Sequence, residues 1–223
     1  MVKDNIVQIR ERIISACSKV NRDPADIKIV AVSKGRGVEE IKEAISFGLN
    51  DIGENRIQEV LEKHNKLHAE GIGSSIRWHM IGHLQTNKVK DAVKIFSLIH
   101  SVDSLILAQE INKRAAQINK TQDILIEIKT SPEATKSGVD PDRASEIIQG
   151  ISQLQNIHIK GLMTIAPLVN RAEEARPYFK KLRQLRDSIN MSYKLSMGMT
   201  DDFEIAIEEG AEIIRIGRGI FES

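Results

Sequence analysis

The segment Ile27–Ser33 reads IKIVAVS, a short and continuous run of β-branched and aliphatic residues. Asn21–Asp26, which contains the turn-forming Pro24, precedes it, and Gly35 follows shortly after. A run of this length between turn signals predicts a strand that is buried on both faces. Such strands occur in parallel sheets, in which a helix connects each strand to the next.

The same alternation of strand and helix continues along the rest of the chain. Short apolar runs predict seven further strands at Asp51–Gly53, Trp78–Gly82, Ser97–Val102, Ile124–Lys129, Ile157–Met163, Lys194–Ser196 and Ile213–Gly217. Apolar residues at helical spacing predict helices between them, over residues 38–48, 57–64, 86–93, 105–118, 144–151, 175–185 and 203–209. Strict alternation of this kind requires parallel strands joined by helical crossovers.

Eight such units in 223 residues predict the α/β class and a single closed (β/α)8 TIM barrel. An extra N-terminal helix is predicted in front of it, because Ile6, Ile9, Ile13 and Cys17 follow helical spacing. An open, doubly wound sheet is the alternative arrangement of the same elements. No shift of composition and no linker rich in Pro or Ser divides the chain, so residues 1–223 are predicted to form one domain.

The composition excludes several classes of protein. Lys and Arg number 32 and Asp and Glu 31, and the resulting net charge of +1 argues against a protein that binds nucleic acid. The single cysteine, Cys17, excludes an internal disulfide and a zinc site made only of cysteines. No apolar run approaches the roughly 20 residues needed to span a bilayer, and Met1–Asn5 lacks the features of a signal peptide. We therefore expect a cytoplasmic protein that does not bind membranes.

Lys34 is the first of several polar residues that follow predicted strands, at the end of the barrel where active sites form. A lysine at the rim of an aliphatic strand is expected to be partly desolvated, which favours its neutral amine. A neutral amine can condense with an aldehyde to give a Schiff base. The alternative is a rim lysine whose ammonium group simply reaches water.

Two segments near the C-terminus favour a phosphate site. Ser196 ends the seventh predicted strand and Gly198 follows it, and the turn Gly217–Gly219 begins at the last residue of the eighth. Barrels commonly bind phosphate in the loops after these two strands. The alternative is ordinary helix capping, since Asp201 and Glu204 have the spacing of a capping box.

Arg215 lies within the aliphatic strand Ile213–Gly217 and needs an acceptor, because an unpaired buried charge is very costly. The acceptor is either a carboxylate inside the barrel, for which Glu127 and Glu54 are candidates, or a ligand. The sequence leaves both open.

His79 and His83 are four residues apart, but a strand and a turn do not present that spacing on one face. No nearby carboxylate or thiolate completes a zinc site, so we predict core or supporting histidines and no metal. The remaining histidines are assigned no role: His64, His68, His100 and His158.

Eight stretches of the chain together resemble one known family. They are AVSK (31–34), DIGENRIQE (51–59), WHMIGHLQTNKVK (78–90), SVD (101–103), KSGV (136–139), GLMTIAP (161–167), LSMGMTDDFEIAIEEGA (195–211) and RIGRGIF (215–221). These motifs resemble the pyridoxal 5'-phosphate homeostasis protein family, single-domain relatives of the barrel half of alanine racemase. The resemblance runs from about residue 5 to the end of the chain. It implies a fold-type III barrel that holds pyridoxal phosphate (PLP).

The resemblance also implies the residues of the site. Lys34 matches the lysine that forms the internal aldimine, Asn55 an asparagine near the cofactor, and Met163 a motif that lines the pocket. Arg215 matches the arginine that faces the pyridine nitrogen. The positions that match the phosphate site are Ser196, Gly198, Gly217 and Arg218. Position 218 is often a small hydroxyl residue in the family, so Arg218 either contacts the phosphate or points to solvent.

An arginine beside the pyridine nitrogen leaves the ring a weaker electron sink than an aspartate would. Tyr178 and Tyr193 lie at no obvious rim position, and we expect no second domain after the last strand. We therefore expect a monomer that binds PLP as a Schiff base, buffers it and delivers it to apo-enzymes, and contributes to amino-acid balance without established turnover. Two alternatives remain: a weak PLP-dependent amino-acid racemase, and a cofactor-free Schiff-base aldolase that acts on a sugar phosphate.

Overall fold

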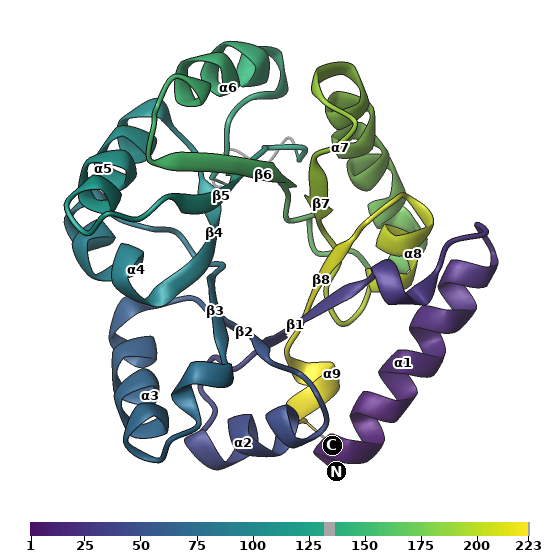
Figure 1. Cartoon of the computed structure of the whole chain (residues 1–223). Coiled ribbons are helices and arrows are strands. Elements are labelled where there is room, and N and C mark those ends of the chain that lie inside the picture. Colours follow the sequence, from purple (N-terminus) through teal and green to yellow (C-terminus); the bar gives the residue numbers. More distant parts are fainter. Residues whose placement is uncertain (132–136, 223) are drawn as a thin grey trace.

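The computed structural model describes residues 1–131 and 137–222, and the eight strands of that part form a closed parallel barrel. The strands are β1 Lys28–Val32, β2 Asp51–Glu54, β3 Arg77–Met80, β4 Phe96–Val102, β5 Gln122–Glu127, β6 Ile157–Met163, β7 Lys194–Ser196 and β8 Ile213–Ile216. Each strand pairs with the next one along the chain, and β8 pairs with β1 (Figure 1). This closure confirms the predicted barrel and excludes the open sheet.

Helices surround the barrel (Figure 1). In the described residues they are α1 Val2–Ser18, α2 Val38–Ser46, α3 Ile57–Ala69, α4 Val89–Ile95, α5 Leu105–Ala116, α6 Ala144–Ser152, α7 Arg176–Ile189, α8 Phe203–Glu208 and α9 Arg218–Phe221. Short 3-10 helices span Pro24–Asp26, Gly73–Ser75, Thr86–Lys88, Pro141–Arg143 and Ala172–Ala175.

The predicted extra helix is α1, and its apolar face, which includes Ile6, Ile9, Ile13 and Cys17, is buried. It packs against α8 and α9, so that the beginning and the end of the described chain lie side by side (Figure 1). The side-chain amide of Asn5 donates to the carbonyl oxygen of Ile220 at 3.0 Å and holds these ends together.

Strand boundaries differ from the predicted ones by up to two residues, and β5 is the clearest case. The pattern of apolar residues predicts Ile124–Lys129, whereas the strand is Gln122–Glu127. Gln122 is fully buried, and its side-chain amide donates to the carbonyl oxygen of Ser97 at 3.2 Å. A polar residue therefore begins this strand, and a hydrophobic pattern cannot detect it.

The interior of the barrel is partly apolar and partly polar. A small apolar cluster inside it is separate from the larger core between strands and helices and consists of Val30, Leu98, Leu125, Met163 and Ile213. Side chains alternate between the two faces of a strand. Glu127 and Arg215 lie two positions beyond Leu125 and Ile213, so they also point inward, one layer nearer the carboxyl ends of the strands.

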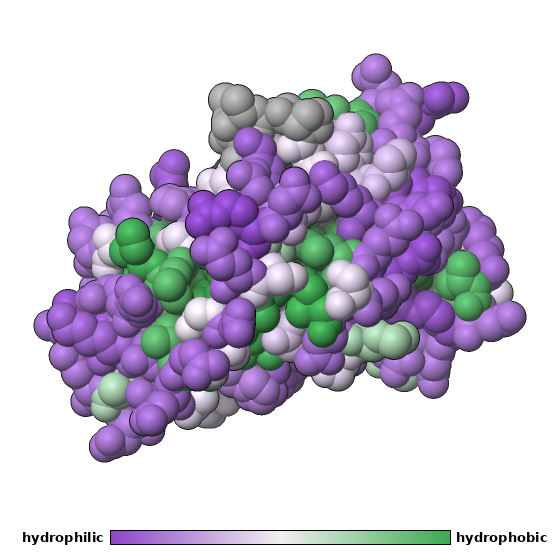
Figure 2. Space-filling view, turned by 90° about the horizontal axis from the view of Figure 1, so that it is seen from above, coloured by the Kyte–Doolittle hydropathy of each residue, from purple (hydrophilic) through white to green (hydrophobic). Residues whose placement is uncertain are grey.

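Figure 2 shows a face on which hydrophilic residues predominate and smaller hydrophobic areas lie between them. The most exposed large apolar side chains of the described residues come from three different segments and are Ile106, Leu168 and Met191. Across residues 1–131 and 137–222, no helix combines the length and the apolar character needed to cross a membrane.

Candidate functional site

A cavity of ≈570 Å³ opens at the carboxyl ends of the strands, the end at which barrels place their active sites. Five of the residues predicted for the cofactor site line it, namely Lys34, Asn55, Arg215, Gly217 and Arg218. They follow or lie within β1, β2 and β8, which are neighbours in the barrel. The closed fold therefore brings together residues from both ends of the chain.

Lys34 lies in the turn after β1 and is exposed. The expectation that it is partly desolvated at the strand rim is wrong, because the chain has already left the strand at this point. Gly35, with a φ of +70°, continues the turn and has no neighbour within 4 Å of an added Cβ. The amine of Lys34 is thus accessible from the cavity.

A buried ion pair supports the backbone just before Lys34. Lys63 on α3 donates to the carbonyl oxygen of Ser33 at 2.7 Å and also to Oε1 of Glu54. The Ser33 hydroxyl donates to the same Glu54 oxygen at 2.5 Å. Glu54 is fully buried and Lys63 nearly so. Three elements, β1, β2 and α3, are therefore tied together directly beneath the lysine turn.

Arg215 is buried and satisfied by neutral acceptors. Its Nη1 donates to Oγ of Ser196 at 2.7 Å, and its Nη2 to the carbonyl oxygen of Thr164 at 2.8 Å. Of the two kinds of acceptor that the sequence left open, the carboxylate is not found, since neither Glu127 nor Glu54 forms an ion pair with Arg215 among the described residues. Burial lowers the pKa of Arg215 to about 10, and nearby carboxylates, Glu127 among them, oppose that shift. It remains a cation at neutral pH.

The loops after β7 and β8 meet at one side of the cavity. The N–H of Gly219 donates to Oγ1 of Thr200 at 3.3 Å. Arg218 is mostly exposed and forms an ion pair with Asp201, so its charge already has a partner. The alternative to a phosphate site, a capping box of Asp201 with Glu204, is wrong, because α8 begins one residue later and Glu204 pairs with Arg12 of α1.

Glu127 is a further member of the cavity lining, which sequence reasoning considered only as a partner for Arg215. Glu127 is 6% exposed, and no hydrogen bond or ion pair joins its carboxylate to another described residue. Burial, together with the charge of Asp103, raises the pKa of Glu127 to about 7, although Arg215 opposes the shift. Its position inside the barrel was expected, and the two-residue period of β5 agrees with it, whereas its place in the cavity lining was not expected.

The two histidines that are four residues apart, His79 and His83, lie in different environments. His79 is buried, with Nε2 2.9 Å from Oδ1 of Asp51, whereas His83 is exposed and lines the cavity. Within the described ranges, no group of three or more His, Cys, Asp or Glu residues could hold a metal ion.

Comparison with known proteins decides the family. The family model for the alanine racemase N-terminal domain matches residues 3–222 of this chain. The pyridoxal phosphate homeostasis protein of Aquifex aeolicus is 44% identical over 98% of this chain and 96% of its own length. The protein of the same name from Pseudomonas aeruginosa is 36% identical over 99% of this chain and 94% of its own length. This chain belongs to the pyridoxal phosphate homeostasis protein family.

A solved structure agrees with this family in fold and in length. PipY of Synechococcus elongatus, with PLP bound, matches with a TM-score of 0.82 and 35% identity. The match covers 96% of this chain and 99% of PipY. The barrel described above is thus similar over nearly its whole length to a structure that contains PLP.

Three residues that the family resemblance assigns to the site do not line the cavity. Met163 is fully buried in the apolar cluster inside the barrel. Ser196 is also buried, and its hydroxyl contacts Arg215 and His100. Gly198 has a φ of +93° and packs so closely on α8 that an added Cβ would lie 2.6 Å from the Cβ of Ala206. These residues support the lining from below. Lys136, in the family stretch KSGV, lies outside the described residues.

Proposed function

We propose that this chain binds PLP reversibly through Lys34 and takes part in PLP homeostasis as a carrier. The observation behind the proposal is that an exposed lysine and a buried arginine, Lys34 and Arg215, line one cavity at the carboxyl ends of the strands. Relatives with 33–44% identity bear the name pyridoxal phosphate homeostasis protein, and PipY has been solved with PLP bound. Both findings support the proposal.

The residues present fit this cofactor. A cavity of ≈570 Å³ falls within the range of about 300–1,000 Å³ that small-molecule sites span. PLP supplies an aldehyde, which a lysine amine can capture reversibly. Lys34 offers this amine, and Arg215 would face the pyridine nitrogen from inside the barrel. The turn Gly217–Gly219 and the Thr200 hydroxyl would hold the phosphate with backbone and side-chain donors.

Two features favour a carrier over a catalyst. The guanidinium of Arg215 keeps its protons at neutral pH, so it would not protonate the pyridine nitrogen as a carboxylic acid can. Tyr178 and Tyr193, the tyrosines of the chain, do not line the cavity. Neither can therefore act there as the base that removal of an α-proton requires.

One observation favours a second candidate, a weak racemase. The Glu127 carboxyl, which has no ion-pair partner among the described residues, lines the same cavity, and its pKa of about 7 suits a group that accepts and returns a proton. Incubation of an α-deuterated amino acid with the PLP-loaded protein would reveal loss of the label. Label loss that disappears in Glu127→Gln would support the racemase, and full retention of the label would remove it.

The same proposal has finer parts: the protein delivers PLP to PLP-dependent apo-enzymes, contributes to amino-acid balance, is a monomer and is located in the cytoplasm. The near-balanced charge of the chain supports a partner that is a small molecule or a protein and not nucleic acid. Sedimentation of the loaded protein would test the monomer.

The chemical test of the proposal is capture of PLP at one lysine. We expect the loaded protein to absorb in the visible region, borohydride to bleach this band, and peptide mass spectrometry to find the cofactor on Lys34. Lys34→Ala should abolish the band. Lys129→Ala is the matched control, because Lys129 lines the same cavity and should not be needed. Cofactor found on Lys129 in the wild type, or normal loading of Lys34→Ala, would refute the assignment.

The functional test is transfer. PLP bound to this protein should activate an apo-enzyme at a rate different from that of free PLP at equal concentration. Equal rates over a range of acceptor concentrations would mean that the acceptor draws only on cofactor released into solution, and delivery would be refuted while binding stands.

A further inference from the structure

A continuous chain of hydrogen bonds runs through the interior of the barrel. His79 Nε2 lies 2.9 Å from Oδ1 of Asp51, and His79 Nδ1 lies 2.9 Å from Nε2 of His100. His100 Nδ1 in turn lies 3.0 Å from Oγ of Ser196, which accepts from Arg215 Nη1 at 2.7 Å. All five side chains are buried, and each comes from a different strand.

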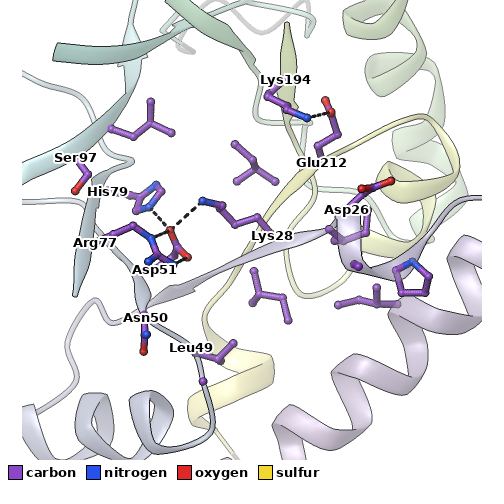
Figure 3. A pocket seen from close by; sticks show the side chains of 18 of the residues that line it. Asp26, Lys28, Leu49, Asn50, Asp51, Arg77, His79, Ser97, Lys194 and Glu212 are labelled. Atoms are coloured by element: carbon purple, nitrogen blue, oxygen red, sulfur yellow. Dashed lines mark hydrogen bonds and ion pairs between the residues drawn. The ribbon is translucent and has the colours of Figure 1, made fainter. Parts of the chain in front are cut away.

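The far end of this chain opens on a second cavity. This cavity, of ≈870 Å³, lies at the amino ends of the strands, on the side of the barrel away from the candidate site. Figure 3 shows the Asp51 carboxylate in its wall, beside Lys28 and Arg77. Lys28 Nζ lies 3.3 Å and Arg77 Nε 2.9 Å from Oδ1 of Asp51. The chain therefore connects two openings of the barrel.

The two ends fix the direction in which every hydrogen bond is donated. Burial raises the pKa of Asp51, but hydrogen bonds from His79 and Arg77 outweigh it and hold this pKa well below its usual range. The ionised Asp51 can only accept, so His79 Nε2 carries a proton. At the other end, Arg215 can only donate, so the Ser196 oxygen accepts from it and its hydroxyl proton is free to point to His100.

The two imidazoles between these ends are neutral. Burial lowers the pKa of His79, with the Asp51 carboxylate opposing it, and burial together with neighbouring charges lowers that of His100 well below its usual value. A neutral His79 that donates from Nε2 must accept at Nδ1, so His100 donates from Nε2 and accepts at Nδ1. One orientation satisfies every member: Arg215 to Ser196, to His100, to His79, to Asp51.

We propose that Asp51, His79, His100 and Ser196 are positioning residues for Arg215, and that their one-way hydrogen-bonded chain links Arg215 to the cavity at the amino ends of the strands. The interior also contains an apolar cluster, so aliphatic side chains can occupy positions inside this barrel. Burying a chain of polar groups costs the free energy of removing them from water, and breaking the chain leaves buried polar groups without hydrogen-bond partners. Its effect is to hold a guanidinium in one place at the base of the candidate site.

The first experiment needs no variant and no cofactor. We expect ¹⁵N NMR of the ring-labelled, unloaded protein to find His79 and His100 as single neutral tautomers protonated at Nε2, unchanged between about pH 6 and 8. Resonances are assigned by their loss in His79→Gln and His100→Gln. A cationic ring at pH 7, or an Nδ1-protonated tautomer at either residue, would overturn the proposed direction.

The second experiment removes the accepting end. Asp51→Leu should leave His79 and His100 as mixtures of tautomers, because nothing then requires donation from Nε2. Glu212→Leu is the matched control, since Glu212 lines the same cavity but pairs with Lys194 at 2.6 Å, outside the chain. We expect wild-type tautomers in the control. Wild-type tautomers in Asp51→Leu would refute the role of Asp51.

The third experiment tests the position of Arg215 by measuring the release of PLP, and it rests on the proposed function. Asp51→Leu and Ser196→Ala should each release PLP about 3- to 10-fold faster than Glu212→Leu, the effect of one weakened hydrogen bond. Because both changes interrupt one chain, the double variant should release PLP no faster than the faster single variant. The positioning role would be refuted if the effects of the two single changes on the release rate multiplied in the double variant. It would also be refuted if the single variants released PLP as slowly as the control. If the wild type retains no PLP, the proposed function fails, and the tautomer measurements still decide on the chain.

Discussion

Removal of the lysine beneath the Lys34 turn should destabilise the protein strongly. Lys63→Met would leave Glu54 fully buried with its ionic partner gone, and would deprive the Ser33 carbonyl oxygen of its 2.7 Å donor. Breaking a buried ion pair on one side costs about 3–5 kcal/mol. In a chain of this size each kcal/mol lowers Tm by about 2–4 °C, so the expected loss is roughly 6–20 °C.

The test is a double-mutant cycle followed by thermal and urea unfolding. The double variant Lys63→Met, Glu54→Gln should recover most of the loss, because a neutral amide can still accept from the Ser33 hydroxyl. Lys42→Met is the control, since Lys42 pairs with more exposed glutamates and should change stability by only about 0–1 kcal/mol. A double variant as unstable as Lys63→Met alone would mean that the loss comes from the packing of the lysine stem, and the reasoning on buried charge would be refuted.

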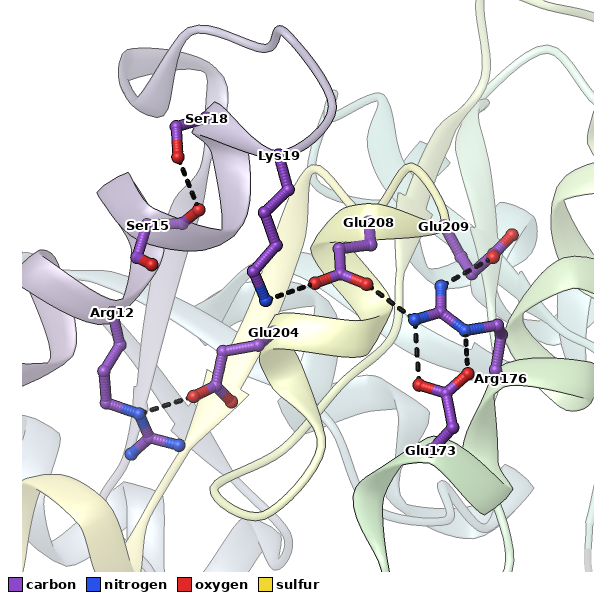
Figure 4. Close-up of polar contacts among 9 residues, drawn as sticks. All are labelled: Arg12, Ser15, Ser18, Lys19, Glu173, Arg176, Glu204, Glu208 and Glu209. Atoms are coloured by element: carbon purple, nitrogen blue, oxygen red, sulfur yellow. Dashed lines mark hydrogen bonds and ion pairs between the residues drawn. The ribbon is translucent and has the colours of Figure 1, made fainter.

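Three further predictions concern glycine geometry, pH and ion pairs. Gly198→Ala should cost about 2–4 kcal/mol, from positive-φ strain plus overpacking, whereas Gly35→Ala, in open space, should cost only about 1–2 kcal/mol in urea unfolding; equal losses would contradict the close contact. Burial raises the pKa of Glu127 to about 7, so the folded protein keeps this proton at a pH at which the unfolded chain has released it. The free energy of unfolding therefore falls as pH rises from about 4.5 to 7. Glu127→Gln should therefore gain up to about 3 kcal/mol relative to the wild type between pH 4.5 and 8, and parallel stability curves would refute this. Arg176→Ala should cost about 1–2 kcal/mol, because it removes one of two ion-pair partners from each of two nearly buried glutamates (Figure 4): Glu208 keeps Lys19 and Glu209 keeps Arg183. The exposed pair of Arg171 should be worth less than about 0.5 kcal/mol, and similar losses in calorimetry would speak against this difference.

The sequence by itself determined the α/β class and the order of strands and helices, and it favoured a closed barrel over an open sheet. Short apolar runs such as IKIVAVS alternate with helical patterns, and this order admits parallel strands joined by helices. It also placed Lys34 and the Gly217–Gly219 turn at the ends of strands, and the motifs pointed to the family. These inferences rest on patterns of residues that are close in the sequence, and such patterns do not depend on the tertiary structure.

Only the tertiary structure decided what the polar side chains inside the barrel contact. His79 and Asp51 are 28 residues apart, and His100 and Ser196 are 96 apart. From the sequence, the acceptor for Arg215 was either a barrel carboxylate or a ligand; in the folded protein Arg215 donates to the Ser196 hydroxyl and the Thr164 carbonyl oxygen. Closure of the sheet sets these distances, because the β8–β1 pairing and the stagger of neighbouring strands bring each inward-facing residue to its layer. No pattern along the chain encodes that stagger, so the partners of buried polar groups emerge only when the barrel is closed.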